Sequence, residues 1–173
     1  NLILSIIKLI EDKMNLEHDI QEAGVQMILL VEDSIRFYSS ILPNLYNYIL
    51  EQSKNFSQEA LNRHAATMRM RGRPKVVLAR TYEEAQKLYD KYSDNTLGVI
   101  SDARFPLKSA AKAFGNEVMP EEKPKHRTDT FGREKCPDAG LQLFRYIRKN
   151  DPFVPLIIES SESENRAKAE AEG

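Results

Sequence analysis

The sequence has few of the features that define several protein classes. Its 173 residues include one cysteine, Cys136, and no tryptophan. A single cysteine excludes a disulfide framework and a zinc site built on several thiolates, and it fits a reducing, cytoplasmic setting. The most apolar run, Leu2 to Ile10, is about half the length of a bilayer span and contains Lys8, so we expect no membrane segment.

Net charge is also nearly absent. Lys and Arg number 25, Asp and Glu number 26, and the formal net charge at pH 7 is −1. A chain without a global positive field does not attract nucleic acid or anionic lipid, so neither is expected as a partner. Apolar residues make up 41%, which is enough for a hydrophobic core, and the length suits one domain with an appendage.

Hydrophobic periodicity predicts a helix followed by four strand–helix units. Residues 1–22 carry apolar side chains at helical spacing, and Gly24 ends that helix. Apolar runs of strand length follow at 27–31, 76–79, 97–100 and 155–158. Buried strands that alternate with helices predict an α/β fold, a three-layer sandwich around a parallel, flavodoxin-like sheet whose fifth strand is missing from this chain.

The helices between the strands carry their own boundary signals. A helical pattern covers residues 34–69, and Pro43 is expected to kink that helix or to mark a new first turn. Thr81 with Glu84 three residues later forms a capping box at the start of the next helix. Residues 140–148 form a further helix, and the composition of residues 162–172 predicts the start of one more.

We expect residues 1–24 to form an N-terminal amphipathic helix or linker and residues 25–173 to form one domain. Residues 107–139 have little periodicity, three prolines, and seven basic against six acidic residues, which predicts a mobile, solvated insertion. Because the insertion begins beside the end of the third strand, Arg104, Lys108 and Lys112 near its root are candidates to pair with Glu32 or Asp33 when no metal is bound. The apolar stripe of residues 2–14 could be a homodimer contact, a link to another module, or a cover for the sheet.

Polar residues follow three of the four predicted strands. Glu32 and Asp33 follow the first, Asp102 follows the third, and Ser160 follows the fourth. In a doubly wound sheet, function collects at the carboxyl ends of the strands. Carboxylates that converge there repel one another unless a cation lies among them, and hard oxygen ligands suit Mg²⁺. An ionised Asp102 could then attack phosphorus to form an aspartyl phosphate.

Four segments in this order resemble the receiver (CheY-like) domain of two-component response regulators. They are Ile28-Leu29-Leu30-Val31-Glu32-Asp33-Ser34, Asp102-Ala103-Arg104-Phe105-Pro106, Gly140-Leu141-Gln142-Leu143-Phe144-Arg145-Tyr146-Ile147-Arg148, and Pro155-Leu156-Ile157-Ile158-Glu159-Ser160-Ser161. The resemblance implies that Asp102 is the phospho-acceptor and that Ser160 is the switch hydroxyl. It also implies Mg²⁺ as cofactor, bound directly by Asp33 and Asp102, through water by Glu32, and by the backbone carbonyl of Arg104.

The resemblance further implies a signalling partner. A histidine kinase or a small phosphodonor would supply the phosphoryl group, and an attached or separate output domain would respond to it. The long insertion is similar to that of receiver modules attached to bacterial phosphoenolpyruvate-synthase-like proteins. On this interpretation the chain is a non-enzymatic regulatory domain, with a place inside a larger enzyme of that kind as an alternative. The lysine that the family carries on its fifth strand lies beyond Gly173.

The sequence leaves two other functions open. The segment Arg71-Gly72-Arg73-Pro74-Lys75 copies the core of an AT-hook, in which a flat basic stretch lies in the minor groove of A·T-rich DNA. A basic turn between a helix and a strand explains the same residues more simply. The acidic residues could also belong to a degenerate receiver that binds partners without being phosphorylated.

Overall fold

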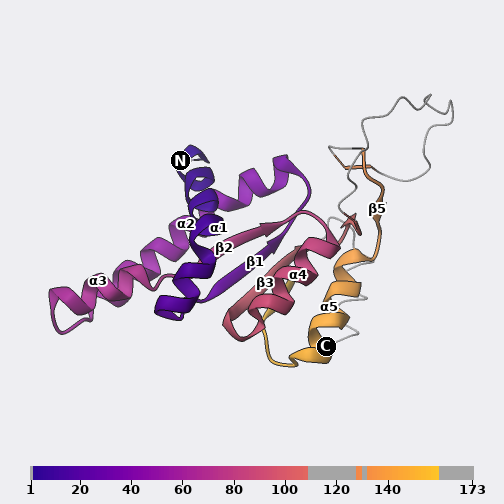
Figure 1. Ribbon diagram of the computed structural model, residues 1–173. Coiled ribbons are helices and arrows are strands. Elements are labelled where there is room, and N and C mark those ends of the chain that lie inside the picture. The colour runs from indigo at the N-terminus through magenta and orange to yellow at the C-terminus, as the bar shows by residue number, and fades with distance from the viewer. Residues whose placement is uncertain (1, 109–127, 130–131, 160–173) are drawn as a thin grey trace, which may run out of the picture.

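The computed structural model describes residues 2–108, 128–129 and 132–159. Its main sheet has four parallel strands in the order β2-β1-β3-β6 (Figure 1). The strands are β1 (Met27–Val31), β2 (Lys75–Ala79), β3 (Thr96–Asp102) and β6 (Leu156–Glu159). This is the order of the first four strands in a flavodoxin-like sheet, so the predicted α/β fold is confirmed. The helix expected within residues 162–172 lies outside the described residues.

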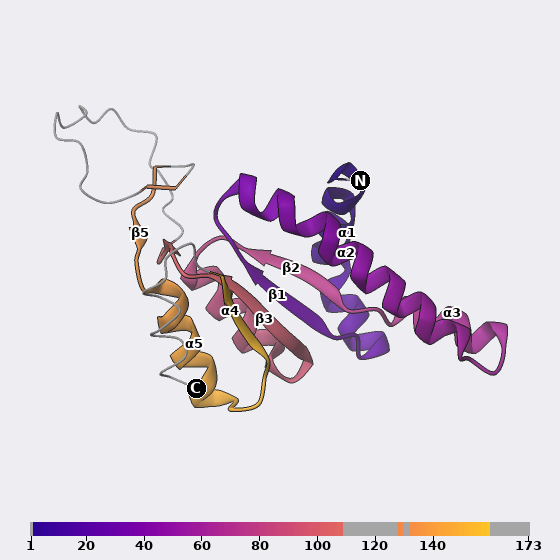
Figure 2. The same cartoon turned by 180° about the vertical axis from the view of Figure 1, so that it is seen from behind.

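Helices cover both faces of the sheet. The long helix α2 (Ile35–Gln58) lies on one face of the sheet (Figure 2). Its buried side chains Leu42, Tyr46 and Ile49 share an apolar core with Leu30 of β1. Helices α4 (Tyr82–Tyr92) and α5 (Ala139–Asn150) lie on the opposite face. The sheet is therefore the middle layer of three, because the buried side chains of β1 alternate between two separate apolar cores.

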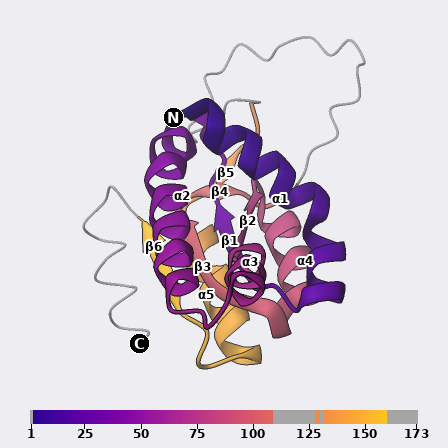
Figure 3. The same cartoon turned by 90° about the vertical axis from the view of Figure 1, so that its left-hand side faces the viewer.

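Helix α1 (Leu2–Ala23) lies along the β2 edge of the sheet, between α2 and α4 (Figure 3). It contributes Leu16 to the core under α4 and α5, and Leu9 to the core under α2. At the same edge, the buried carboxylate of Asp12 accepts a hydrogen bond of 3.0 Å from the backbone N–H of Val76. An edge strand presents unpaired backbone groups, and α1 covers those of β2.

The apolar stripe of α1 faces away from the sheet. Ile3 is 76% exposed and Met14 is 78% exposed, and Ile7 and Ile10 are more than half exposed. The residues that face inward are Ser5, Asp12 and Leu16. The prediction that this stripe covers the sheet is therefore wrong. The helix is oriented by the ion pairs and hydrogen bonds of Asp12 rather than by its isoleucines.

The helical pattern of residues 34–69 corresponds to two helices in the structure. Helix α2 continues through Pro43 and ends at Gln58, and α3 (Arg63–Arg71) follows it. The new helix begins where Asn62 caps it, with the Asn62 side chain accepting a 2.8 Å hydrogen bond from the N–H of Ala65. The new first turn is thus at residue 63 and not at Pro43.

The capping of α4 agrees with the sequence pattern. The Thr81 hydroxyl accepts a hydrogen bond from the N–H of Glu84 at 3.2 Å. The Glu84 carboxylate reaches back to the N–H of Arg80 at 3.0 Å, one residue before the cap. A short 3₁₀ helix, η1 (Ser93–Asn95), then leads into β3.

The two ends of the predicted insertion form a small antiparallel ribbon. Strand β4 (Phe105–Pro106) pairs with β5 (Lys135–Cys136), and an isolated bridge joins Thr128 to Glu134. Next to β4, the carbonyl of Leu107 accepts a hydrogen bond of 3.0 Å from Glu83 at the start of α4. The described ends of this segment are therefore held against the domain. Residues 109–127 and 130–131 lie outside the described residues, so the expectation of a mobile, solvated insertion stays a prediction.

None of the helices within the described ranges is both long enough and apolar enough to cross a membrane.

Candidate metal centre

The candidate site lies at the carboxyl ends of the two central strands. Glu32 and Asp33 directly follow β1, and Asp102 is the last residue of β3. Because the register of this parallel pair places Val31 opposite Ser101, the chain brings Glu32 and Asp102 to the same height. One carboxylate oxygen from each of the three acids lies within 4.8 Å of the other two.

Backbone hydrogen bonds fix the first strand end. The N–H of Glu32 donates to the carbonyl of Ala79 on β2 at 3.0 Å. The Glu32 carboxylate accepts a 2.9 Å hydrogen bond from the N–H of Ser34, which precedes the first turn of α2. The two acids are thus held between β2 and α2, and their side chains are almost completely enclosed, at 4% exposure for Glu32 and 0% for Asp33.

Burial and mutual repulsion make this site costly to ionise. The pKa of Glu32 is raised to about 7, chiefly by burial and also by the negative charges of Asp102 and Asp33, which together outweigh the hydrogen bond from Ser34. Burial also raises the pKa of Asp102, although hydrogen bonds from the N–H groups of Arg104 and Ala103 act in the opposite direction. Three carboxylates in this arrangement favour a proton or a cation among them.

A lysine from β5 reaches into the same site. The ammonium of Lys135 donates a hydrogen bond of 2.8 Å to Oδ1 of Asp33 and lies 2.8 Å from Oδ2. Its positive charge also opposes the upward pKa shifts of Glu32 and Asp102, so it acts on all three acids. No sequence pattern indicated Lys135, which is 102 residues from Asp33 in the chain. The expected pairing candidates were Arg104, Lys108 and Lys112, and Lys112 lies outside the described residues. On Asp33 the structure places Lys135, from the far end of the insertion.

The end of β3 requires a glycine beside it. A Cβ atom on Gly140, in the first turn of α5, would lie 2.5 Å from the carbonyl oxygen of Asp102 and 3.0 Å from Cα of Ala103. The close approach allows the N–H of Gly140 to donate a hydrogen bond of 3.1 Å to the carbonyl of Ala103. Gly140 therefore lets α5 press against the backbone that presents Asp102.

The residues fit a small, hard cation. All the donors are carboxylate oxygens, which Mg²⁺ prefers, and they converge from two strands. Oδ2 of Asp33 is fully buried and makes no hydrogen bond, although the Lys135 ammonium is near it. A buried carboxylate oxygen that has an ammonium beside it and makes no hydrogen bond is available to a cation that replaces this ammonium.

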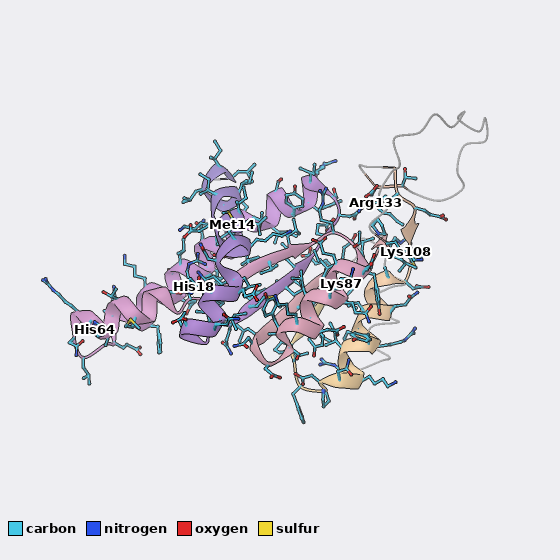
Figure 4. The ribbon with its side chains drawn as sticks, viewed as in Figure 1. Met14, His18, His64, Lys87, Lys108 and Arg133 are labelled. Atoms are coloured by element: carbon cyan, nitrogen blue, oxygen red, sulfur yellow. The ribbon has the colours of Figure 1, made fainter. Side chains whose placement is uncertain are left out.

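The structure thus brings Glu32, Asp33 and Asp102 together. Arg104 lies two residues beyond Asp102, in the short link between β3 and β4, and coordination by its carbonyl stays a prediction. Ser160 lies outside the described residues. In Figure 4, Lys108 and Arg133 lie at the end of the molecule that carries this site, and His64 on α3 lies at the other end.

The AT-hook interpretation is wrong on structural grounds. Arg73 is 7% exposed and Lys75 is 6% exposed, because both pair with acidic residues of α1. The Arg73 guanidinium donates two hydrogen bonds to Asp12, at 2.7 and 3.2 Å, and Lys75 forms an ion pair of 2.7 Å with Asp19. Minor-groove binding needs these side chains exposed on a segment that is separate from the fold. Here the segment connects the end of α3 at Arg71 to the start of β2 at Lys75.

No protein-family model matches the chain, and no curated protein matches it. Among solved structures, the chain is similar to the crystal structure of a response regulator receiver domain protein from Clostridium thermocellum. The identity is 17%, the TM-score is 0.44, and the match covers 86% of this chain and 77% of that chain. A likeness this loose carries no assignment of function, so the chain's own strand order and acidic site are what support one.

Proposed function

We propose that this chain is a regulatory domain that receives a phosphoryl group on Asp102, with Mg²⁺ held by Glu32, Asp33 and Asp102. One observation carries the proposal. The order of the strands reverses between β1 and β3, and the three buried acids are at the carboxyl ends of those two strands. A crevice at such a switch point is where doubly wound sheets bind their ligands.

The chemistry requires an ionised, positioned carboxylate. An oxygen of Asp102 attacks the phosphorus of the donor, a new P–O bond forms, and the donor's leaving group departs with the electron pair of the broken bond. Hydrogen bonds from Arg104 and Ala103 favour the ionised form of Asp102 against the effect of burial. When bound, Mg²⁺ supplies positive charge against the phosphoryl oxygens. The Arg104 carbonyl is a further ligand in this proposal, and Glu32 contributes through water.

The proposal also covers the partners and setting. A histidine kinase or a small phosphodonor provides the phosphoryl group, and an attached or separate output domain reads the modified state in the cytoplasm. Ser160 supplies the switch hydroxyl, since it directly follows Glu159, the residue that pairs in register with Asp102. A phosphoenolpyruvate-synthase-like enzyme as the attached protein stays a prediction from the sequence resemblance.

The test is phosphorylation by acetyl phosphate, followed by intact-mass and peptide mass spectrometry. We expect one phosphoryl group, dependent on Mg²⁺ and located on Asp102, and its loss in Asp102→Asn. Asp94→Asn is the matched control, because Asp94 is exposed in η1 just before β3, while Asp102 ends the same strand. The control should be modified like the wild-type protein.

The outcomes separate two functions. Modification that persists in Asp102→Asn, or that does not depend on Mg²⁺, contradicts the proposal. Mg²⁺ binding without any modification would favour the second candidate, a degenerate receiver that acts only as an interaction domain.

A further inference from the structure

The ammonium of Lys135 already occupies the acidic site in this structure. It lies 2.8 Å from both carboxylate oxygens of Asp33, and its side chain is 18% exposed against 0% for that of Asp33. This contact is shielded from water on the Asp33 side, so it is stronger than an ion pair on the surface.

A divalent cation needs the same oxygens. Oδ2 of Asp33 is the buried acceptor that no hydrogen bond satisfies, and Oδ1 is the oxygen that accepts from Lys135. A cation bound to Asp33 would lie within a few ångströms of the lysine ammonium and would repel it. The two positive charges therefore compete for one carboxylate.

Lys135 lies on β5, a strand that is held by fewer contacts than β4. Strand β5 has two residues and pairs only with β4 among the described residues. Strand β4 itself is firmly placed, since Phe105 is fully buried and the carbonyl of Leu107 accepts from Glu83. Loss of the contact with Asp33 would thus affect β5 more than β4.

We propose that Lys135 is a built-in competitor for the metal site, held on Asp33 when no metal is bound and displaced when a divalent cation binds. Metal binding then releases the β5 side of the ribbon from the pocket. This inference rests on the proposed Mg²⁺ site and adds to it how occupancy is transmitted to the insertion.

The test is the Mg²⁺ affinity of the purified chain by isothermal titration calorimetry. Lys135→Met should tighten Mg²⁺ binding by at least about fivefold, because it removes a competing charge at close range. Lys108→Met is the matched control. It removes the same charge from an exposed position at the other root of the insertion, and its affinity should stay within about twofold of wild type. Lys135→Arg, which keeps the charge, should bind nearly as weakly as wild type.

Amide hydrogen exchange gives a readout independent of affinity. Mg²⁺ should speed exchange at residues 133–136 in the wild-type protein and leave it unchanged in Lys135→Met. Unchanged or weaker Mg²⁺ binding in folded Lys135→Met, with Lys135→Arg behaving like Lys135→Met, would overturn the inference and leave the metal site intact. If neither wild type nor Lys135→Met binds Mg²⁺, the proposed function fails instead.

Discussion

Asp12 and Asp33 are both completely buried, and their surroundings differ. Asp12, on α1, accepts four hydrogen bonds: two from Arg73, one from the hydroxyl of Tyr46 and one from the N–H of Val76. Asp33, after β1, accepts from Lys135, and its Oδ2 has no hydrogen bond. At the α1 edge the charges of Asp12 and Asp19 are matched by those of Arg73 and Lys75. At the acidic site after β1 and β3, three carboxylates meet near the ammonium of Lys135.

The difference separates a structural ion pair from a site prepared for a ligand. A buried charge whose hydrogen bonds are all made holds elements together and leaves no position for anything else. A buried carboxylate with an oxygen that makes no hydrogen bond, beside two other acids, is tolerated where a ligand will complete it. The ion pairs of Asp12 with Arg73 and Lys75 fix α1 on β2. The ammonium of Lys135 on Asp33 can be exchanged for another cation.

The largest expected effect is at the α1 edge. Asp12→Ala leaves Arg73 and Lys75 buried without this partner, so we expect a loss of about 3–5 kcal/mol in the free energy of unfolding, measured by urea denaturation. Asp19→Ala is the control, because Asp19 is 30% exposed on its side chain and should cost no more than about 1 kcal/mol. Equal losses for the two variants would show that Asp12 has no special role.

The pocket should respond to pH in the opposite way to a structural acid. The folded pKa of Glu32 is about 7, against an ordinary value of 4.5. The folded state therefore binds the proton more tightly, and the free energy of unfolding falls as pH rises from about 4.5 to 7, by up to about 3 kcal/mol from this group. In metal-free Glu32→Gln this fall should shrink, as followed by thermal or urea unfolding across that range. Asp102, whose pKa is also raised, should leave a smaller remaining slope. If the free energy of unfolding depended on pH identically in wild type and Glu32→Gln, the raised pKa of Glu32 would be contradicted.

The close packing at the end of β3 gives an intermediate effect. In Gly140→Ala the new methyl group would overlap the Asp102 carbonyl at 2.5 Å, so the backbone must shift. We expect a loss of about 1–3 kcal/mol in stability, with changes in the amide signals of Asp102 and Ala103 by NMR. Gly98→Ala is the comparison at the opposite end of β3, where the nearest atom is the carbonyl oxygen of Pro155 at 3.3 Å. It should leave the signals of Asp102 in place. Movement of the pocket signals in both variants would argue against a specific contact at Gly140.

The smallest effect on stability is expected on the outer face of α1. Ile7→Glu changes a side chain that is 53% exposed, so the free energy of unfolding should change by no more than about 0.5 kcal/mol. If a second copy of the chain covers this face, the same variant should reduce the molar mass seen by light scattering. Leu16→Ala, at a buried position on the inner face, should destabilise the fold by about 2–5 kcal/mol. A large loss of stability in Ile7→Glu without a change of mass would mean that the stripe packs within the monomer.

Much of this structure could be predicted from local patterns. The four strands follow from continuous apolar runs, and the acids of the pocket follow from the residues at the ends of two of those runs. The orientation of α1 could not be predicted, because its isoleucine periodicity is strong and the burial of Asp12 depends on Arg73, far along the chain. The break between α2 and α3 was signalled by Asn62, a good N-cap, which the nearby Pro43 obscured.

The contact between Lys135 and Asp33 illustrates the limit most clearly. It depends on the pairing of β4 with β5, two strands of two residues each that no hydrophobic pattern predicts. The sequence predicted that the insertion begins beside the acidic site, and it indicated basic residues near the N-terminal end of the insertion as the partners of the acids. The pairing of Pro106 with Lys135 instead brings the far root back to the site. Long-range contacts of this kind are set by tertiary structure and not by local propensity.

The most direct measurement is an Mg²⁺ titration of the isotope-labelled chain, followed by backbone amide shifts at both buried aspartates. We expect saturable changes at Glu32, Asp33 and Asp102 and none at Asp12 or Asp19. The first group gathers three carboxylates and includes an oxygen without a hydrogen bond, whereas both oxygens of Asp12 accept hydrogen bonds. In Asp33→Asn the changes in the pocket should disappear. Absence of saturable change in the pocket at millimolar Mg²⁺, or equal changes at Asp12, would contradict the assignment of this acidic cluster as a cation site.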